Sequence, residues 1–281
     1  MPGEGEVDPS AWVGRTEDAT DVLGLTPARA LAATLDLGEP LDVGAVLPPL
    51  WHWLYLLPLA PTSTLGPDGH PSRGGFLPPI DLERRMWAGG RLRFERDLHL
   101  GEEVRRRSRI EAVTPKEGKA GPMVFVRVWH EVSTPAGIAI EEEQDIVYVH
   151  KPDLFRSPPA DPLPPVAWEH EVPIDPVLLF RFSALTFNAH RIHYDAPYST
   201  QVEHYPGLVV HGPLQAVLLM QAARRHRPAG RPASFSFRAS RPLFGSQPCT
   251  VAGVRSSDGG DELFTANPDR DVAMRAQVTW A

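Results

Sequence analysis

The chain has 281 residues, which is enough for one large domain or two domains of ordinary size. Its content of 42% hydrophobic and 22% charged residues excludes a disordered polar chain, and its net charge of −7 argues against a general nucleic-acid binder, which needs a basic face. The single cysteine, Cys249, excludes an internal disulfide.

The amino-terminal residues lack the charged start and apolar run of a signal peptide, and we therefore expect a cytoplasmic protein. The longest apolar stretch near the front, residues 47–61, is interrupted by several prolines and by His52. Proline in a helix interior removes a hydrogen bond and clashes with the preceding turn, so this stretch does not predict a membrane-spanning helix. We expect no membrane partner.

The first predicted element is a helix over residues 26–35, with Thr26 as its cap and Pro27 at the first helical position. Residues 48–79 are rich in proline and glycine and contain two short motifs, at 51–53 and 68–70. This composition predicts a long ordered loop.

Between residues 90 and 149 the pattern changes to strands. Strands are predicted at 91–94, 104–113, 123–132 and 146–149, and the run 123–132 alternates between two faces at period two. Turn signals at 116–118 and 135–137 separate these runs. This pattern predicts an antiparallel hairpin or meander. The segment 151–176 that follows is rich in proline, which is typical of an extended linker. We therefore place a domain boundary there, with an amino-terminal domain over 1–150 and a carboxy-terminal domain over 177–281.

The most apolar helix of the chain is predicted over residues 212–225, with Pro213 in its first turn and apolar residues nearly all round the helical wheel. Strands are predicted after it at 235–238, 250–254, 262–265 and 272–280. In the last run, Val272, Met274, Ala276, Val278 and Trp280 share one face. A buried helix followed by antiparallel strands predicts an α+β fold.

One segment carries a recognisable motif. Asn188, His190, His193 and Asp195, followed by His211 and Gly212, match in spacing the Asp-x-Asn-x-x-His-x-Asp and His-Gly pattern of the MaoC-like hydratases. Asn188 stands where that family has Asp, and His190 stands where it has Asn. The chain also resembles the two-domain members of this family in four shorter motifs, at 68–70, 76–79, 85–90 and 180–188. The last of these motifs resembles the subgroup that includes fungal mitochondrial hydroxyacyl-thioester dehydratases and bacterial itaconyl- or mesaconyl-CoA hydratases.

The resemblance implies a double hotdog fold, in which each antiparallel sheet wraps a central helix, and a cofactor-free reversible hydratase of enoyl-CoA thioesters. A short branched dicarboxylyl-CoA, such as itaconyl- or mesaconyl-CoA, is the expected substrate, and a fatty-acid-type 3-hydroxyacyl thioester is the alternative. Hydration needs a base for water, a polar partner for that water and donors for the enolate oxygen. We assign these roles to His193, Asn188 and the N–H of Gly212.

Because an amide cannot act as a general base, the second proton-transfer group is open between His193 itself, His190 and Asp195. Five residues are expected to bind substrate: His190, Asp195, His211, Arg85 and Trp87. Arg84 and Arg85 either bind a carboxylate or CoA phosphate or form a solvated charge pair. Trp51 and Trp53 either cover an acyl pocket or pack in the core.

Two other classes of function compete with this interpretation. The spacing of His190, His193 and Asp195 contains residue types that bind divalent metals, although we expect no metal. A thioesterase or a non-catalytic acyl-CoA-binding module could use the same fold. The expected partner is the acyl-CoA substrate. Two hotdogs in one chain can form an internal pseudo-dimer, and isologous pairing of whole chains into a homodimer is the other possible assembly; the sequence does not choose between them.

Overall fold

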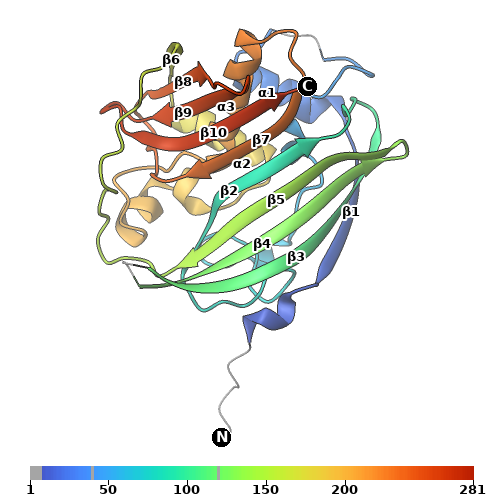
Figure 1. The fold of residues 1–281 in the computed structure, drawn as a ribbon. Helices are drawn as coiled ribbons and strands as arrows, with labels where there is room; N and C mark the ends of the chain where they lie inside the picture. The colour runs from blue at the N-terminus through green and yellow to red at the C-terminus, as the bar shows by residue number, and fades with distance from the viewer. Residues whose placement is uncertain (1–7, 39–40, 119–120) are drawn as a thin grey trace, which may run out of the picture.

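The computed structural model describes residues 8–38, 41–118 and 121–281. Within them, ten strands form one antiparallel sheet in the order β1-β3-β4-β5-β2-β7-β10-β9-β8-β6. Three α-helices lie on one face of this sheet (Figure 1). The predicted α+β class and the two-part sheet are thereby confirmed.

The strands divide between the two halves of the chain. The amino-terminal half supplies β1 (Thr16–Val22), β2 (Arg84–Phe94), β3 (Glu103–Gly118), β4 (Gly121–Thr134) and β5 (Gly137–Val149). The carboxy-terminal half supplies β6 (Trp168–Val172), β7 (Pro232–Ala239), β8 (Cys249–Arg255), β9 (Asp261–Ala266) and β10 (Val272–Trp280). Most of these strands were predicted, but β1 was missed, and β6 lies in the segment that was predicted to be a linker.

The two halves join where β2 pairs with β7. Gly89 lies opposite Arg238, and a Cβ atom added at Gly89 would stand 2.5 Å from the Phe237 carbonyl oxygen. Only glycine permits this close approach. The sheet therefore continues without a break from one half to the other.

The alternation predicted for the last strand is confirmed in β10. Val272, Met274, Ala276 and Val278 are buried, whereas Arg275, Gln277 and Thr279 are exposed on the other face. The turn predicted at 116–118 is wrong, because β3 continues to Gly118 and pairs with β4 there. The residues that connect these strands, 119–120, lie outside the described part of the chain.

The predicted linker contains structure of its own. Residues Trp168–Val172 form β6, which pairs with β8 at the edge of the sheet. An edge position tolerates nearby prolines because one side of the strand needs no ladder partner. The domain boundaries at 150 and 177 stay a prediction.

The helices differ in their surroundings. Helix α1 (Leu25–Thr34) begins one residue earlier than predicted, with Gly24 as its cap and no side-chain cap. Thr26 therefore lies inside the first turn, and the predicted Thr cap is wrong. Helix α2 (Pro176–Leu185) is capped by Asp175, which accepts from the N–H of Leu178 at 2.7 Å.

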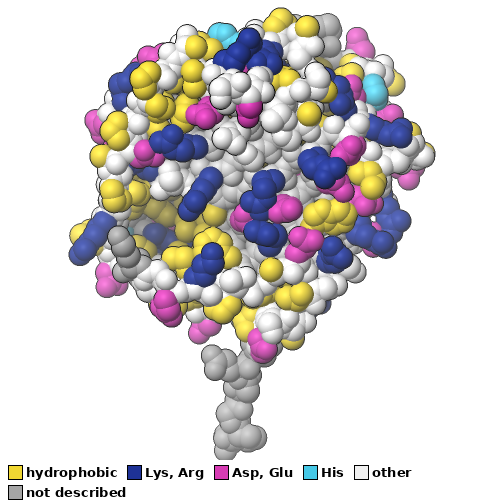
Figure 2. Space-filling view, viewed as in Figure 1, with side chains coloured by type: hydrophobic (Ala, Val, Ile, Leu, Met, Phe, Trp, Pro, Cys, Tyr) yellow, Lys and Arg dark blue, Asp and Glu magenta, His cyan; other side chains and the backbone are white. Residues whose placement is uncertain are grey.

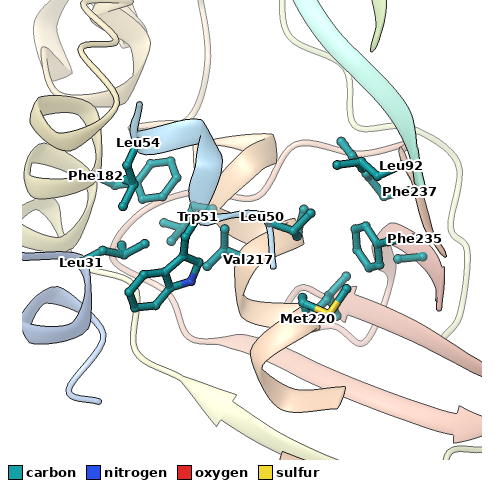
Figure 3. Close-up of a cluster of buried hydrophobic side chains, with 14 of the residues drawn as sticks. Leu31, Leu50, Trp51, Leu54, Leu92, Phe182, Val217, Met220, Phe235 and Phe237 are labelled. Atoms are coloured by element: carbon teal, nitrogen blue, oxygen red, sulfur yellow. The ribbon is translucent and has the colours of Figure 1, made fainter. Parts of the chain in front are cut away.

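Helix α3 (Gly212–His226) confirms the predicted central helix, with Pro213 in its first turn. It packs against β8, β9 and β10, whereas α1 packs mainly against α2 and the short 3-10 helix η2 (Trp51–Leu54). Figure 3 shows Val217 and Met220 of α3 among side chains from both halves, including Trp51, Phe182 and Phe235. The main core therefore gathers around α3.

The opposite face of the sheet is exposed, and dark-blue side chains are spread across it in Figure 2, with magenta side chains beside several of them. Ion pairs there include Arg91 with Glu143 at 2.7 Å and Arg127 with Asp145 at 3.2 Å. No helix in the described residues is long and apolar enough to cross a membrane.

Candidate active site

The segment between α2 and α3 holds the residues predicted to carry the chemistry. Asn188 follows Phe187, whose φ of 49° turns the chain sharply after α2. The Oδ1 atom of Asn188 accepts a hydrogen bond from the N–H of His190 at 3.0 Å, an Asx turn that leads into the 3-10 helix η4 (Arg191–His193). This turn fixes the backbone positions of His190 and His193.

His193 is buried, with 8% of its surface exposed, and it lines a large cavity. Its Nδ1 atom lies 2.7 Å from the Val209 carbonyl oxygen, which can only accept, so Nδ1 carries the proton. The Nε2 atom therefore carries a free lone pair, and no hydrogen bond to it is found within the described residues. Burial lowers the pKa of His193 to about 4, although the Val209 carbonyl opposes the shift. A neutral imidazole of this kind can accept a proton from water.

His211 lies behind His193 and not in the cavity wall. The two rings stack with centroids 3.7 Å apart, and His211 Nε2 lies 2.8 Å from Ser183 Oγ. Burial, followed by the nearby His193 and His190, lowers the pKa of His211 well below its usual value. His211 therefore supports His193 from behind and precedes the first turn of α3.

The start of α3 opens into the same cavity, which Gly212 and Pro213 line. The first N–H groups of a helix have no intrahelical acceptor, and they carry the positive end of its dipole. Pro213 has no N–H, so Gly212 provides the foremost donor. This is suitable geometry for an oxyanion.

A loop from the amino-terminal half completes this end of the cavity. Gly69, with φ of 89°, lies so close to the other half that an added Cβ would stand 1.8 Å from the Ala189 carbonyl oxygen. The N–H of Arg191 also donates to the Asp68 carbonyl at 2.9 Å. These contacts place the ring of His70 against that of His190, with centroids 4.1 Å apart.

Asp68 orients His70. Its Oδ2 atom lies 2.8 Å from His70 Nδ1, and its Oδ1 accepts from the N–H of His70 at 3.0 Å. Burial lowers the pKa of His70, and the bond with Asp68 opposes this. Burial would raise the pKa of Asp68, but the hydrogen bonds and charge of His70 hold it below its usual value. Burial, then His70 and His193, lower the pKa of His190.

Asp68, His70 and His190 present donor atoms within 4.8 Å of one another, a composition that also occurs at metal sites. Two observations favour a hydrogen-bonded pair instead. Asp68 already binds His70 at both carboxylate oxygens, and the positive charge of Arg85 acts on both imidazoles, which disfavours a second cation. The metal set considered from the sequence does not assemble, because Asp195 lies elsewhere.

The carboxylate of Asp195 is occupied outside the cavity wall. It pairs with Arg191 at 2.8 Å and accepts from the N–H of Tyr198 at 3.1 Å. Of the two predicted arginines, Arg84 pairs with Glu203 at 2.7 Å, whereas Arg85 lines the cavity and forms no ion pair within the described residues. Trp87, also predicted, lines the cavity beside Trp53, with ring centroids 5.0 Å apart.

The cavity has a volume of about 1300 Å³ and extends from the histidines into the amino-terminal half. Its far wall includes Val128, Val132 and Ile146 from β4 and β5. A buried polar cluster also lies there: Glu142 binds His52 Nε2 at 3.0 Å, Trp53 Nε1 at 3.0 Å and Gln144 Nε2 at 2.8 Å. Both halves therefore build one chamber.

Several of these residues were missed as site residues. Asp68 and His70 were placed in a predicted loop and in the family resemblance without a role in the site, since no spacing rule connects them with a motif more than a hundred residues away. Ser183, Val209 and the cluster at Glu142 were not predicted. Trp51 packs in the core, whereas Trp53 lines the cavity. Of the two alternatives for this pair, core packing therefore holds for Trp51 and a place at the pocket holds for Trp53.

Comparison with known proteins places this arrangement in a class. A MaoC-like dehydratase from Phytophthora capsici matches the structure with a TM-score of 0.70 at 13% identity, covering 98% of each chain. A Mycobacterium tuberculosis protein described as a double hotdog matches with a TM-score of 0.59 at 14% identity, covering 95% of this chain and 96% of that one. The chain has the double hotdog fold.

The sequence comparisons identify the family. The model of hydroxyacyl-thioester dehydratase type 2 matches residues 50–245, and the chain belongs to this family. Mesaconyl-C(4)-CoA hydratase from Chloroflexus aurantiacus is 50% identical over 273 residues, covering 95% of this chain and 96% of the relative. The mitochondrial hydroxyacyl-thioester dehydratase type 2 of Schizosaccharomyces pombe is 29% identical, covering 89% and 93%. The protein is therefore an enzyme of the hydro-lyase class, and the prediction of that class is confirmed.

Proposed function

We propose that the protein adds water reversibly to the double bond of a short dicarboxylyl-CoA thioester, with mesaconyl-C(4)-CoA as the leading substrate. The observation that carries this proposal is that His193, with Nδ1 bound to Val209 and Nε2 left free, lines the same cavity as the first turn of α3. A base and an oxyanion site thus share one chamber. The 50% identity to a hydratase of this thioester supports the choice of substrate.

The proposed roles follow from these positions. His193 takes a proton from water, whose oxygen bonds to Cβ, and the π electrons move onto the thioester oxygen near the N–H of Gly212. Asn188 orients the water, and its bond with the N–H of His190 fixes the direction of its amide. Loss of one oxyanion donor typically costs about 10²–10³ in rate, so the start of α3 contributes as much as the base.

The entrance of the cavity suits an acyl-carrier arm. Leu59, Phe180, Phe187 and Tyr194 line it and are exposed. Exposed apolar side chains at a pocket mouth favour contact with a partly apolar ligand. We assign this rim to the pantetheine portion of CoA.

Arg85 supplies the specificity for a second carboxylate. It lines the cavity and forms no ion pair with any residue that the structure describes, and its charge reaches His70 and His190. A free carboxylate on the acyl group would therefore lie beside the reacting carbons and meet an unpaired guanidinium. His190 and Trp87 form the neighbouring wall.

A second candidate substrate is a longer 3-hydroxyacyl thioester of the fatty-acid type. The observation in its favour is the depth of the chamber, whose far wall carries Val128, Val132 and Ile146. The relation to the fungal dehydratase supports it too.

A thioester panel tests both candidates and the class. Incubation with mesaconyl-C(4)-CoA should add the mass of water to the intact thioester, whereas release of free CoA would indicate hydrolysis. We expect Arg85→Gln to lower kcat/KM about 10²-fold for mesaconyl-C(4)-CoA but to leave crotonyl-CoA, which lacks the second carboxylate, nearly unchanged. Arg91→Gln, on the same strand but paired with Glu143 outside the chamber, is the control. Equal losses for both thioesters would contradict the role of Arg85.

The homodimer and the cytoplasmic location remain proposals. Sedimentation of the purified protein measures the first, and localisation of the tagged full chain measures the second.

A further inference from the structure

The chamber holds three imidazoles in a row, and the water-activating role uses only one of them. His193 lies next to His190 with ring centroids 5.4 Å apart, and His190 lies next to His70 at 4.1 Å. All three line the cavity. At such separations ring nitrogens can exchange a proton directly or through one water.

Two contacts hold His70, at the end of this row, in a fixed orientation. Asp68 holds His70 through Nδ1 and leaves Nε2 of this cavity-lining ring available, and the close contact at Gly69 fixes the whole loop on the segment that carries His190. An ionised carboxylate on the far nitrogen of a histidine fixes the tautomer and stabilises the imidazolium when it forms. Asn188, by contrast, cannot transfer a proton.

We propose that His70, oriented by Asp68, is the second proton-transfer group and that His190 connects it with His193. This inference rests on the proposed function and adds the residue that serves Cα. His70 is thus a catalytic residue from the amino-terminal half, and Asp68 is its positioning residue.

The steps balance. Water loses a proton to His193 Nε2 as its oxygen bonds to Cβ. The thioester becomes an enolate, whose oxygen lies near the N–H of Gly212. The proton passes through His190 to His70, which delivers it to Cα as the thioester carbonyl forms again. One water is added, and the three imidazoles return to their neutral state.

Deuterium exchange at Cα separates this role from water activation. Methylsuccinyl-C(4)-CoA, the saturated counterpart of mesaconyl-C(4)-CoA, has no double bond to hydrate, so its exchange in D₂O needs only the group that serves Cα and the oxyanion site. We expect His70→Gln to slow exchange and hydration by about 10²–10⁴-fold. His193→Gln should slow hydration strongly but exchange by only a few fold.

A matched control exists on the surface. Glu83 and His150 form a carboxylate–imidazole pair with the same Nδ1-to-oxygen distance of 2.8 Å, far more exposed than Asp68 and His70. His150→Gln should leave exchange and hydration unchanged. Equal melting temperatures for the variants exclude a folding defect as the cause.

Asp68→Asn tests the positioning role. Besides Asp68, the charged and titratable groups near His70 are Arg73, Arg85, His190 and His193. Because Asp68 raises the pKa of His70 and exchange needs the neutral ring, its loss should move the half-maximal pH of exchange downward and lower the rate. A merely structural residue would not move this profile.

Three results would overturn the inference: normal exchange in His70→Gln, absence of exchange in a wild-type protein that hydrates, or stoichiometric bound metal whose chelation stops exchange. Failure of the wild-type protein to hydrate any thioester would instead count against the proposed function itself.

Discussion

The two halves of the molecule use the same strand arrangement for different purposes. In the carboxy-terminal half, α3 fills the concave side of β8, β9 and β10 with small and apolar side chains. In the amino-terminal half, the longer strands β3, β4 and β5 face the chamber, and α1 packs against α2 instead. The filled half thus provides a helix start for chemistry, and the open half provides room for the acyl group.

The sharpest test of this division is the loss of the base. We expect His193→Gln to lower kcat for hydration by about 10³-fold, because the substitution removes the neutral nitrogen that accepts the proton from water. Steady-state kinetics measures the effect, and circular dichroism verifies folding. His170→Gln, on β6 of the same half, should retain activity. Near-normal turnover of His193→Gln would sink the assignment.

Stability should distinguish the filled half from the open one. Leu219 of α3 is fully buried, so Leu219→Ala should cost about 2–5 kcal/mol of unfolding free energy. Ile146 already borders the chamber, and Ile146→Ala should cost about 1 kcal/mol while raising KM, since it enlarges existing space rather than opening a new void.

Urea unfolding measures both changes. Equal costs at the two positions would contradict the contrast between the halves.

Acid should weaken both halves through buried histidines. Burial lowers the pKa of His193 and of His130 on β4 to about 4 each, below the unfolded value of about 6.5. The unfolded chain binds more protons between these pH values, so stability is complete above pH ~6.5 and falls as pH drops toward ~4. Each of the two histidines should lower the free energy of unfolding by about 2 kcal/mol at pH 5 relative to pH 7.5.

Denaturant unfolding at the two pH values, compared with His193→Gln, measures one of these contributions. A variant with the same pH dependence as the wild type would contradict it.

The sequence was sufficient for much of the fold. Period-two patterns predicted the strands around β4 and β10, and the apolar run after Pro213 predicted α3, because these elements bury a regular set of side chains. Asn188, His190, His193 and Gly212, which the spacing of the motif groups together, line one chamber.

What the sequence did not predict depends on contacts between distant segments. The stacking of His211 on His193, the ion pair that removes Arg84 from the chamber and the placement of Asp68 and His70 all arise from tertiary packing. β1 was missed because its burial pattern is almost entirely exposed, which leaves no hydrophobic alternation to detect. Asp195 matched a motif, yet it serves local structure with Arg191.

The pairing of β2 with β7 has a consequence for the integrity of the chain. Proteolytic cleavage in the proline-rich segment would leave two fragments that meet at the seam between β2 and β7. Once separated, each fragment would expose a row of unpaired backbone groups along its strand of this seam. Either fragment alone would tend to aggregate at that edge, whereas together they offer complementary edges in a register fixed by Gly89. Reassociation of two nicked fragments would thus restore the shared chamber, and activity would report on how faithfully the seam had closed.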